Sequence, residues 1–156
     1  MKMSLYQSDV EYQSEARSLS EAEYAALAHF RHALRRFTAF SDEMLGDAGL
    51  GPRRYQALLA IRAAAGGSGF SVGDLADVLI IKPNTAAELA NRLEDAGLIR
   101  RVRDLRDRRR ALLELTDEGA RRLDQVAHVH FAKLQESRAV FMNLFTSREE
   151  AASGSD

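Results

Sequence analysis

Hydrophobic residues recur at helical spacing along most of the chain, which predicts a mainly helical fold. The first long pattern covers residues 20–47, where apolar side chains return every three or four positions: Leu27, Phe30, Leu34, Phe37 and Met44. Ser20 precedes this pattern, and Glu23 follows Ser20 by three residues, which is the spacing of a capping box at a helix N-terminus. We therefore expect a long first helix that ends near the glycines at 46–49.

Three shorter helical patterns follow. The first begins at Pro52, since proline fits the first turn of a helix, and its apolar positions are Tyr55, Leu58, Leu59 and Ile61. The second covers 72–79 after Ser71, with an expected buried face of Leu75, Ala76, Val78 and Leu79. The third covers 83–96 and is closed by Gly97. About three residues separate the last two helices, the spacing of a DNA-reading helix-turn-helix.

Two short β-forming runs come next, "LIRRVRD" and "ALLELT", joined by an arginine-rich turn. Thr116 is placed to cap a further helix, which is followed by a last apolar run near 138–145 and a polar tail. A helix-turn-helix followed directly by a β-hairpin is a winged helix. The predicted fold class is therefore mainly α with a small β-hairpin wing (α+β).

Charge changes this picture only locally. The net charge is −1, yet the segment from Leu98 to Arg110 holds seven arginines and two aspartates, so it carries +5 and the remainder −6. So many arginines on one hairpin repel one another, and exposed ion pairs contribute little to stability. A polyanion therefore explains the segment better than stability does, with a solvated charged turn as the alternative.

Composition removes several classes of function. The chain has no cysteine, which excludes disulfides, thiolate metal sites and thiol-based sensing. No apolar run approaches the roughly 18 residues of a membrane helix, and the N-terminus has no secretory signal pattern. The expected location is therefore the cytoplasm, without membrane association. No nucleophile–base arrangement or phosphate loop is visible, so we expect neither an enzyme nor a cofactor.

The fourth helix carries the candidate base-reading residues. Its apolar side packs inward, and its opposite side presents polar groups of low net charge, which suit base edges better than phosphates. Lys82 and the free amides at the start of the helix are placed for a phosphate. The candidate DNA contacts on this helix are Asn84, Thr85, Glu88, Asn91 and Arg92. The alternative is an ordinary solvated helix face.

The hairpin supplies the remaining DNA candidates. Arginine at a tight loop can enter a narrow minor groove, and arginines on strand edges can neutralise phosphates. Arg100, Arg101 and Arg103 are expected on the first strand as phosphate contacts or ion-pair partners, and Arg109 completes the DNA candidates. Arg106 and Arg108 are the best minor-groove candidates, with Asp104 and Asp107 shaping the turn.

Residues 71–119 resemble the MarR family (multiple antibiotic resistance regulators). The resemblance is carried by Leu75-Ala76, by "RLEDAGLIRR" at the end of the fourth helix, by "DLRDRR" in the hairpin and by "LTDEG" at the start of the next helix. It extends over nearly all of the chain except its ends. It implies a homodimeric winged-helix transcription factor that binds a pseudo-palindromic double-stranded DNA operator, usually a repressor released by a small ligand.

With this resemblance, the chain divides into four parts. Residues 1–19 form an N-terminal arm, 20–50 and 117–147 a helical dimerisation region, 51–116 the winged helix-turn-helix lobe, and 148–156 a polar tail. The resemblance makes Asn84, Thr85 and Glu88 base contacts and Arg106 or Arg108 the arginine at the tip of the wing. The alternative function is a winged-helix protein-interaction or architectural module without ligand control.

The effector is expected to be an aromatic or other organic acid, because family members often hold such ligands between the dimerisation helices and the lobe. Candidate carboxylate partners are His32, Arg35, Arg36 and Tyr55, and candidate apolar walls are Phe37, Phe40 and Leu58. The alternative is that the phenylalanines are plain core. His29 and His32 are three residues apart, but no carboxylate is clearly placed beside them, so we predict no metal site.

Overall fold

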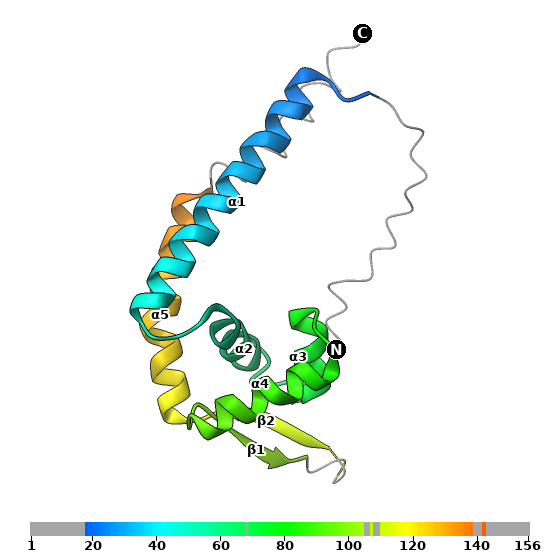
Figure 1. Ribbon diagram of the computed structural model, residues 1–156, viewed down its shortest axis with the longest axis vertical. Helices are drawn as coiled ribbons and strands as arrows, with labels where there is room; N and C mark the ends of the chain where they lie inside the picture. Colours follow the sequence, from blue (N-terminus) through cyan, green and yellow to red (C-terminus); the bar gives the residue numbers. More distant parts are fainter. Residues whose placement is uncertain (1–17, 68, 105–106, 108–109, 139–141, 143–156) are drawn as a thin grey trace. The chain divides into compact units, whose positions relative to one another are not determined.

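The computed structural model describes residues 18–67, 69–104, 107, 110–138 and 142. In chain order the described elements are α1 (Glu21–Asp47), α2 (Pro52–Ala63), α3 (Val72–Leu79), α4 (Pro83–Asp95), β1 (Ile99–Arg103), β2 (Ala111–Leu115) and α5 (Asp117–Glu136) (Figure 1). This order confirms the predicted fold class, a mainly helical chain with a two-stranded wing. The predicted N-terminal arm up to residue 17, most of the last apolar run and the polar tail lie outside the described residues.

The helix ends follow the local sequence signals. The Ser20 backbone N–H donates to Glu23 at 2.8 Å and the Glu23 N–H donates to the Ser20 hydroxyl at 3.2 Å, so the predicted capping box is present. A second capping box opens α3, where Ser71 and Asp74 make the same reciprocal pair. Proline occupies the first turn of both α2 and α4. Each start is fixed by residues that lie within one helical turn.

The hairpin is attached to the helix-turn-helix by backbone hydrogen bonds. β1 and β2 are antiparallel, with Ile99 opposite Leu115 and Arg103 opposite Ala111. The Leu113 N–H donates to the Phe70 carbonyl at 2.7 Å, which adds the segment before α3 to the edge of β2. This segment comes close because Gly69 has φ +87° and no side chain; a Cβ atom there would overlap the Leu112 side chain.

The core of the winged helix forms where α2, α3 and α4 meet the hairpin. Its fully buried members include Leu58, Leu75, Leu93 and Ile99. The expected inner face of α4 is confirmed, since its buried residues are Ala86, Leu89, Ala90 and Leu93. The expected inner face of α3 is wrong at one position: Val78 is 47% exposed. The helix is only two turns long, and Val78 lies beyond the edge of the buried face that Leu75 and Ala76 form. Leu59 on α2 is likewise 43% exposed.

The chain forms two compact units. One comprises Ala39–Ala132, which includes the whole winged helix, and the other comprises the chain before Ala39 and after Ala132. In α1 the buried residue is Leu45, whereas Leu27 is 52% and Leu34 is 39% exposed. Phe30 and Phe37 of the same helix are half-buried. No helix in the described part of the chain has the length and hydropathy to cross a membrane.

One threonine joins three elements at the base of the winged helix. The Thr116 hydroxyl donates to the Gly97 carbonyl at 2.6 Å and accepts from the Gly119 N–H at 3.0 Å, so it caps α5 as predicted. Gly119 is required here because a Cβ atom would overlap the Leu98 carbonyl oxygen. The "LT-x-x-G" pattern therefore encodes a close contact between the end of α4, the hairpin and the start of α5.

Candidate nucleic-acid interface

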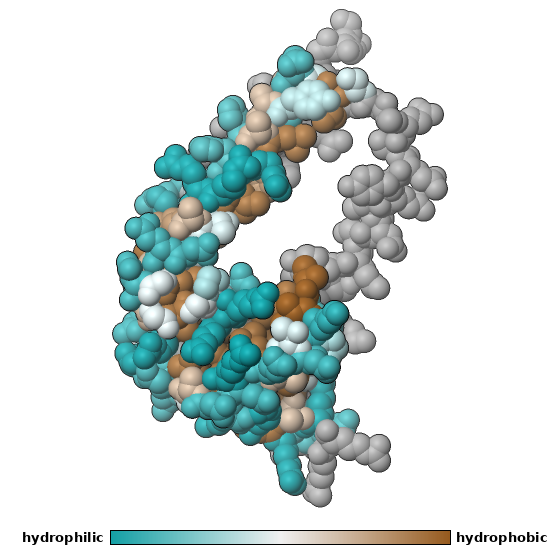
Figure 2. Space-filling model, in the orientation of Figure 1, coloured by the Kyte–Doolittle hydropathy of each residue, from teal (hydrophilic) through white to brown (hydrophobic). Residues whose placement is uncertain are grey.

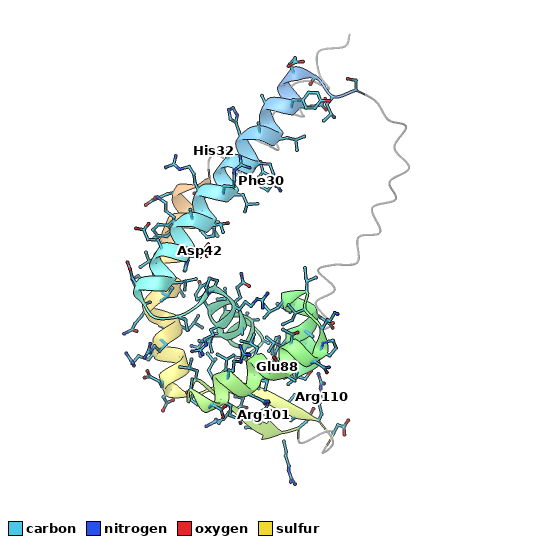
Figure 3. All side chains as sticks on the ribbon, in the orientation of Figure 1. Phe30, His32, Asp42, Glu88, Arg101 and Arg110 are labelled. Carbon is cyan, nitrogen blue, oxygen red and sulfur yellow. The ribbon has the colours of Figure 1, made fainter. Side chains whose placement is uncertain are left out.

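The outward face of α4 is polar and exposed. Asn84, Glu88 and Asn91 lie along it at steps of four and three residues, opposite the buried alanines and leucines, and all three are exposed. Thr85 is half-buried beside them. Glu88 and Arg92 form an exposed ion pair at 3.7 Å, so this side of the helix carries little net charge. Figure 3 shows Glu88 on α4 in the same lobe as Arg101 and Arg110 of the hairpin.

The start of α4 has polar backbone groups available. Lys82 occupies the N-cap position and makes no side-chain cap, in contrast to Ser71 at the start of α3. Uncapped amides at a helix N-terminus attract anions, and the exposed Lys82 ammonium adds a positive charge beside them. The geometry therefore suits one phosphate group at this end of the helix.

Arg101 on β1 connects the hairpin to the end of α4. Its guanidinium forms an ion pair with the Glu94 carboxylate and donates to the Asn91 side-chain oxygen at 2.7 Å. The Arg101 backbone N–H also donates to Glu94 at 3.2 Å. Because the Arg101 side chain is only 30% exposed, these bonds are partly shielded from water. The sequence left Arg101 as a phosphate contact or an ion-pair partner, and the structure gives it a carboxylate partner inside the lobe.

Arg110 makes a second connection, from the hairpin to the start of α3. Its guanidinium donates to the Asp74 carboxylate at 2.9 Å, next to the capping box of Ser71. Burial alone would raise the pKa of Asp74, but hydrogen bonds from Ser71 and the charge and hydrogen bond of Arg110 outweigh it and lower that pKa. Asp74 and Arg110 are 36 residues apart, so no local pattern in the sequence indicates this pair.

The structure describes some of the predicted wing residues, and the others lie outside the described part of the chain. Arg103 is exposed at the end of β1, and Asp104 is only 8% exposed directly after it. In the turn, the Asp104 N–H donates to the Arg110 carbonyl and the Arg110 N–H to the Asp107 carbonyl, at 3.0 and 2.9 Å. Both aspartates therefore belong to the closed base of the turn. The predicted DNA contacts Arg106, Arg108 and Arg109 lie outside the described residues.

Arg100 points away from the α4 side of the hairpin. It alternates with Arg101 along β1 and pairs across the strands with Glu114 at 2.9 Å. Its side chain is 64% exposed. Arg100 and Arg101 are therefore adjacent arginines that lie on opposite faces of the hairpin. Arg100 pairs with Glu114 of β2, and Arg101 pairs with Glu94 of α4.

The predicted ligand residues are divided between the two compact units. His32 is exposed on α1 (Figure 3). Arg35 and Arg36 are exposed on the same helix, and Phe37 is half-buried. Phe40, Tyr55 and Leu58 belong to the other unit, where Leu58 is fully buried in the core. The structure therefore gathers three of the seven candidates in one unit and leaves the others in the second.

The sequence did not identify the residue around which Phe40 and Tyr55 gather. His130 of α5 lies with its ring centre 4.6 Å from that of Tyr55 and 6.1 Å from that of Phe40. Its Nε2 atom is 2.8 Å from the Ser41 hydroxyl, and the residue is 6% exposed. Burial lowers the pKa of His130 and raises the pKa of Tyr55. The cluster is thus a neutral, aromatic contact between α1, α2 and α5.

A cavity of about 700 Å³ lies between the connection from α2 to α3 and the hairpin. Its described lining includes Ile61, Phe70, Val102 and Leu115, with Arg62 and Arg103 among the polar groups. None of the seven predicted ligand residues lines it. Among the described residues, no cluster of three or more histidines and acids could hold a metal ion, and His29 and His32 belong to no such cluster there.

The fold and these surfaces define a winged helix-turn-helix protein. The MarR family model matches residues 48–110, which run from the residue after α1 to the residue before β2. The HTH-type transcriptional regulator PecS of Dickeya dadantii (strain 3937) is 29% identical over 89 residues, covering 57% of this chain. The match spans 54% of PecS, so it covers about half of that curated relative.

Solved structures match over most of the chain. AbsC of Streptomyces coelicolor, a MarR family transcriptional regulator, is 25% identical with a TM-score of 0.62, covering 88% of this chain and 93% of AbsC. A MepR–DNA complex from S. aureus is 21% identical with a TM-score of 0.57, covering 79% and 90%. CouR of Rhodococcus jostii RHA1, bound to p-coumaroyl-CoA, is 22% identical with a TM-score of 0.63, covering 88% and 98%. The last two likenesses show the fold alone. Together with the family model and PecS, these matches make the chain similar to MarR family proteins, with the family model covering the winged helix up to the turn of the hairpin.

Proposed function

We propose that the protein is a sequence-specific DNA-binding transcriptional regulator. The observation that carries the proposal is the exposed, nearly neutral polar face of α4 beside an arginine-bearing hairpin, which one ion pair joins to α4 and another to α3. In this reading α4 enters the major groove and Asn84, Thr85 and Glu88 contact base edges. Lys82 and the exposed Arg103 contact phosphates, and the tip arginines Arg106, Arg108 and Arg109 reach the flanking minor groove.

The regulator acts as a homodimer in this proposal. Apolar side chains remain exposed in the unit formed by the chain before Ala39 and after Ala132, including Tyr24, Leu27, Leu34, Leu134 and Met142. Figure 2 shows hydrophobic side chains along α1. A second copy of the chain would bury them and would place two α4 helices against a pseudo-palindromic operator with half-sites about one helical turn apart.

Binding to DNA upstream of the protein's own gene tests the proposal. We expect a retarded complex of one dimer per site in a gel shift, with an affinity that falls steeply as salt rises from about 50 to 200 mM, because phosphate contacts release counterions. A scrambled duplex of equal length is the control. Absent binding, or binding that ignores both salt and sequence, would contradict the proposal.

The alternative is a winged-helix interaction or architectural module. The two functions differ in the role of α4, since only a sequence reader needs Asn84 and Glu88 for base preference. Asn84→Ala and Glu88→Ala should change which base is preferred at single operator positions. If both variants bind every sequence as the unmodified protein does, the module is the better description.

We further propose that the regulator is a repressor released by a small aromatic or organic acid. The bound p-coumaroyl-CoA of CouR supports this class of ligand for a chain of the same fold. A thermal-shift screen of aromatic carboxylic acids and their CoA thioesters tests it, because a ligand that binds only the folded protein raises its melting temperature. A true effector should also weaken the DNA complex; a stabilising ligand without that effect would not be the signal. Nothing in this function requires catalysis.

A further inference from the structure

We propose that Arg101 is a positioning residue for base reading, which sets Asn91 to recognise a hydrogen-bond acceptor on the edge of guanine or thymine. The inference rests on the proposed function, because it concerns how the same α4 face selects DNA. It assigns Arg101 a role other than neutralising a phosphate.

The argument begins with the bond between the two side chains. The Arg101 guanidinium donates to the Asn91 side-chain oxygen at 2.7 Å. A guanidinium has only donors, so the asparagine must turn its oxygen toward Arg101 and its NH₂ group elsewhere. Asn91 is exposed and lies on the same outward stripe as Asn84 and Glu88, so its NH₂ group is offered outside the lobe.

Glu94 keeps Arg101 in this position. Its carboxylate accepts from both the guanidinium and the backbone N–H of Arg101, so the arginine is held at two points. Glu94 is three residues after Asn91 and therefore lies on the same side of the helix, toward β1. The ion pair also neutralises the positive charge of Arg101 within the lobe. The Arg101 side chain is therefore held against α4.

This arrangement changes what Asn91 can read. A free asparagine can pair with adenine through both its oxygen and its NH₂ group, which match the adenine donor and acceptor. With its oxygen turned toward Arg101, Asn91 presents its NH₂ group, a donor, to the groove. Guanine N7 and O6 and thymine O4 are acceptors in the major groove. Adenine N7 is also an acceptor, but it stands beside the N6 amino donor, which finds no partner on the Asn91 NH₂ group, and the cytosine N4 amino group is a donor and is rejected. The expected preference is guanine or thymine at one position of each half-site.

Selection from a pool of randomised duplexes tests the inference with the full-length protein. We expect the unmodified protein to enrich guanine or thymine at one symmetric pair of positions. Asn91→Ala should lose that preference, with about a 3- to 10-fold loss of affinity for the selected site. Arg101→Met should lose the same preference, and the double variant should be no worse than either, because both changes remove one interaction.

Arg100→Met is the matched control, since Arg100 is the adjacent arginine on the same strand and pairs with Glu114 on the other face of the hairpin. It should keep the base preference. Modified duplexes identify the acceptor: 7-deazaguanine removes N7, 5-methyl-2-pyrimidinone lacks the thymine O4, and a methylphosphonate removes a phosphate charge. Sensitivity to the methylphosphonate alone would show a phosphate contact and overturn the inference.

Two outcomes separate this inference from the proposed function. If no sequence is enriched at all, sequence-specific regulation fails. If a sequence is enriched and Arg101→Met retains every preference while binding is uniformly weaker, only the positioning role fails. The side-chain ¹⁵N–¹H signals of Asn91 in DNA-free protein provide a readout that needs no operator. They should shift in Arg101→Met and stay in place in Arg100→Met, and no shift would overturn the inference.

Discussion

At the scale of single residues, Ile80 is the one described non-glycine residue with a positive φ. It ends α3 with φ +52° and ψ +49°. The left-handed region costs an ordinary residue roughly 1–2 kcal/mol, more for a β-branched one. The side chain recovers little by burial, because it is 76% exposed. Figure 2 shows hydrophobic surface over this end of α3.

Replacing Ile80 should therefore stabilise the protein. We expect Ile80→Gly to raise the free energy of unfolding by about 1 kcal/mol, because glycine adopts this conformation without strain and is the usual residue at a helix end of this type. Urea denaturation measures the change. Val78→Gly is the matched control: it lies two residues earlier inside the helix, is also exposed, and should lower stability by about 1 kcal/mol. Equal signs for the two variants would contradict the argument.

Residue-level prediction from the sequence succeeded where the partners are close in the chain. Ser20 with Glu23 and Thr116 with Gly119 are each three residues apart, so their hydrogen bonds are written in a short motif. Prediction did not reach Arg110 and Asp74, because such a pair depends on the path of the whole hairpin. The left-handed Ile80 was missed for another reason: glycine or asparagine normally marks that conformation, and neither is present.

At the scale of elements, apolar spacing predicted each described helix and the hairpin, and proline and capping residues fixed most boundaries to within one or two residues. It was less reliable for which face is buried. Val78 has apolar neighbours in sequence but faces outward from a two-turn helix. The sequence also did not predict which helices pack against α1. His130 on α5 packs on Tyr55 of α2 and Phe40 of α1, and contacts between three distant helices leave no periodic trace.

The contact of α1, α2 and α5 at His130 should make stability depend on pH. Burial lowers the pKa of His130, so the unfolded chain accepts a proton near its ordinary pKa of about 6.5 while the folded protein does not. Stability is then full above that value and declines as the pH falls toward the lower folded pKa. We expect a smaller free energy of unfolding at pH 5.5 than at pH 7.5, measured by urea denaturation.

His130→Gln should flatten this dependence, since glutamine can still bond the Ser41 hydroxyl and does not titrate. The comparison is made on the slope of stability against pH, so a uniform loss of stability in the variant does not affect it. The matched control is His128→Gln, at an exposed position two residues earlier on α5. An equal flattening in that control would contradict the assignment to His130.

At the scale of the whole molecule, the charge of the hairpin is smaller than its composition implies. Four of the seven arginines between Leu98 and Arg110 lie in the described part of the chain, and three of these four form ion pairs with carboxylates of the lobe: Arg100, Arg101 and Arg110. These three shape the hairpin and attach it to α3 and α4. The sequence predicted where the positive charge is concentrated, but which arginines form ion pairs within the lobe depends on the folded structure.

The salt dependence of DNA binding should reveal that division. We expect the double variant Arg106→Ala, Arg108→Ala to weaken binding to all sequences and to reduce the slope of log affinity against log salt by about 2 per protomer. Arg100→Met should change the slope by less, because Glu114 already neutralises that guanidinium. Filter binding over a salt series gives both slopes. A larger change for Arg100→Met would contradict the assignment.

The Thr116 hydroxyl bonds have a mechanical consequence. The Thr116 hydroxyl oxygen holds the Gly97 carbonyl after α4 and the Gly119 amide in the first turn of α5, and Gly119 brings the two backbones into direct contact. No slack remains at this joint for α5 to bend independently of α4. In the proposed regulator, we therefore expect a torque applied to the start of α5 to turn the winged helix with it, so that a signal reaching this joint changes the angle between α4 and DNA.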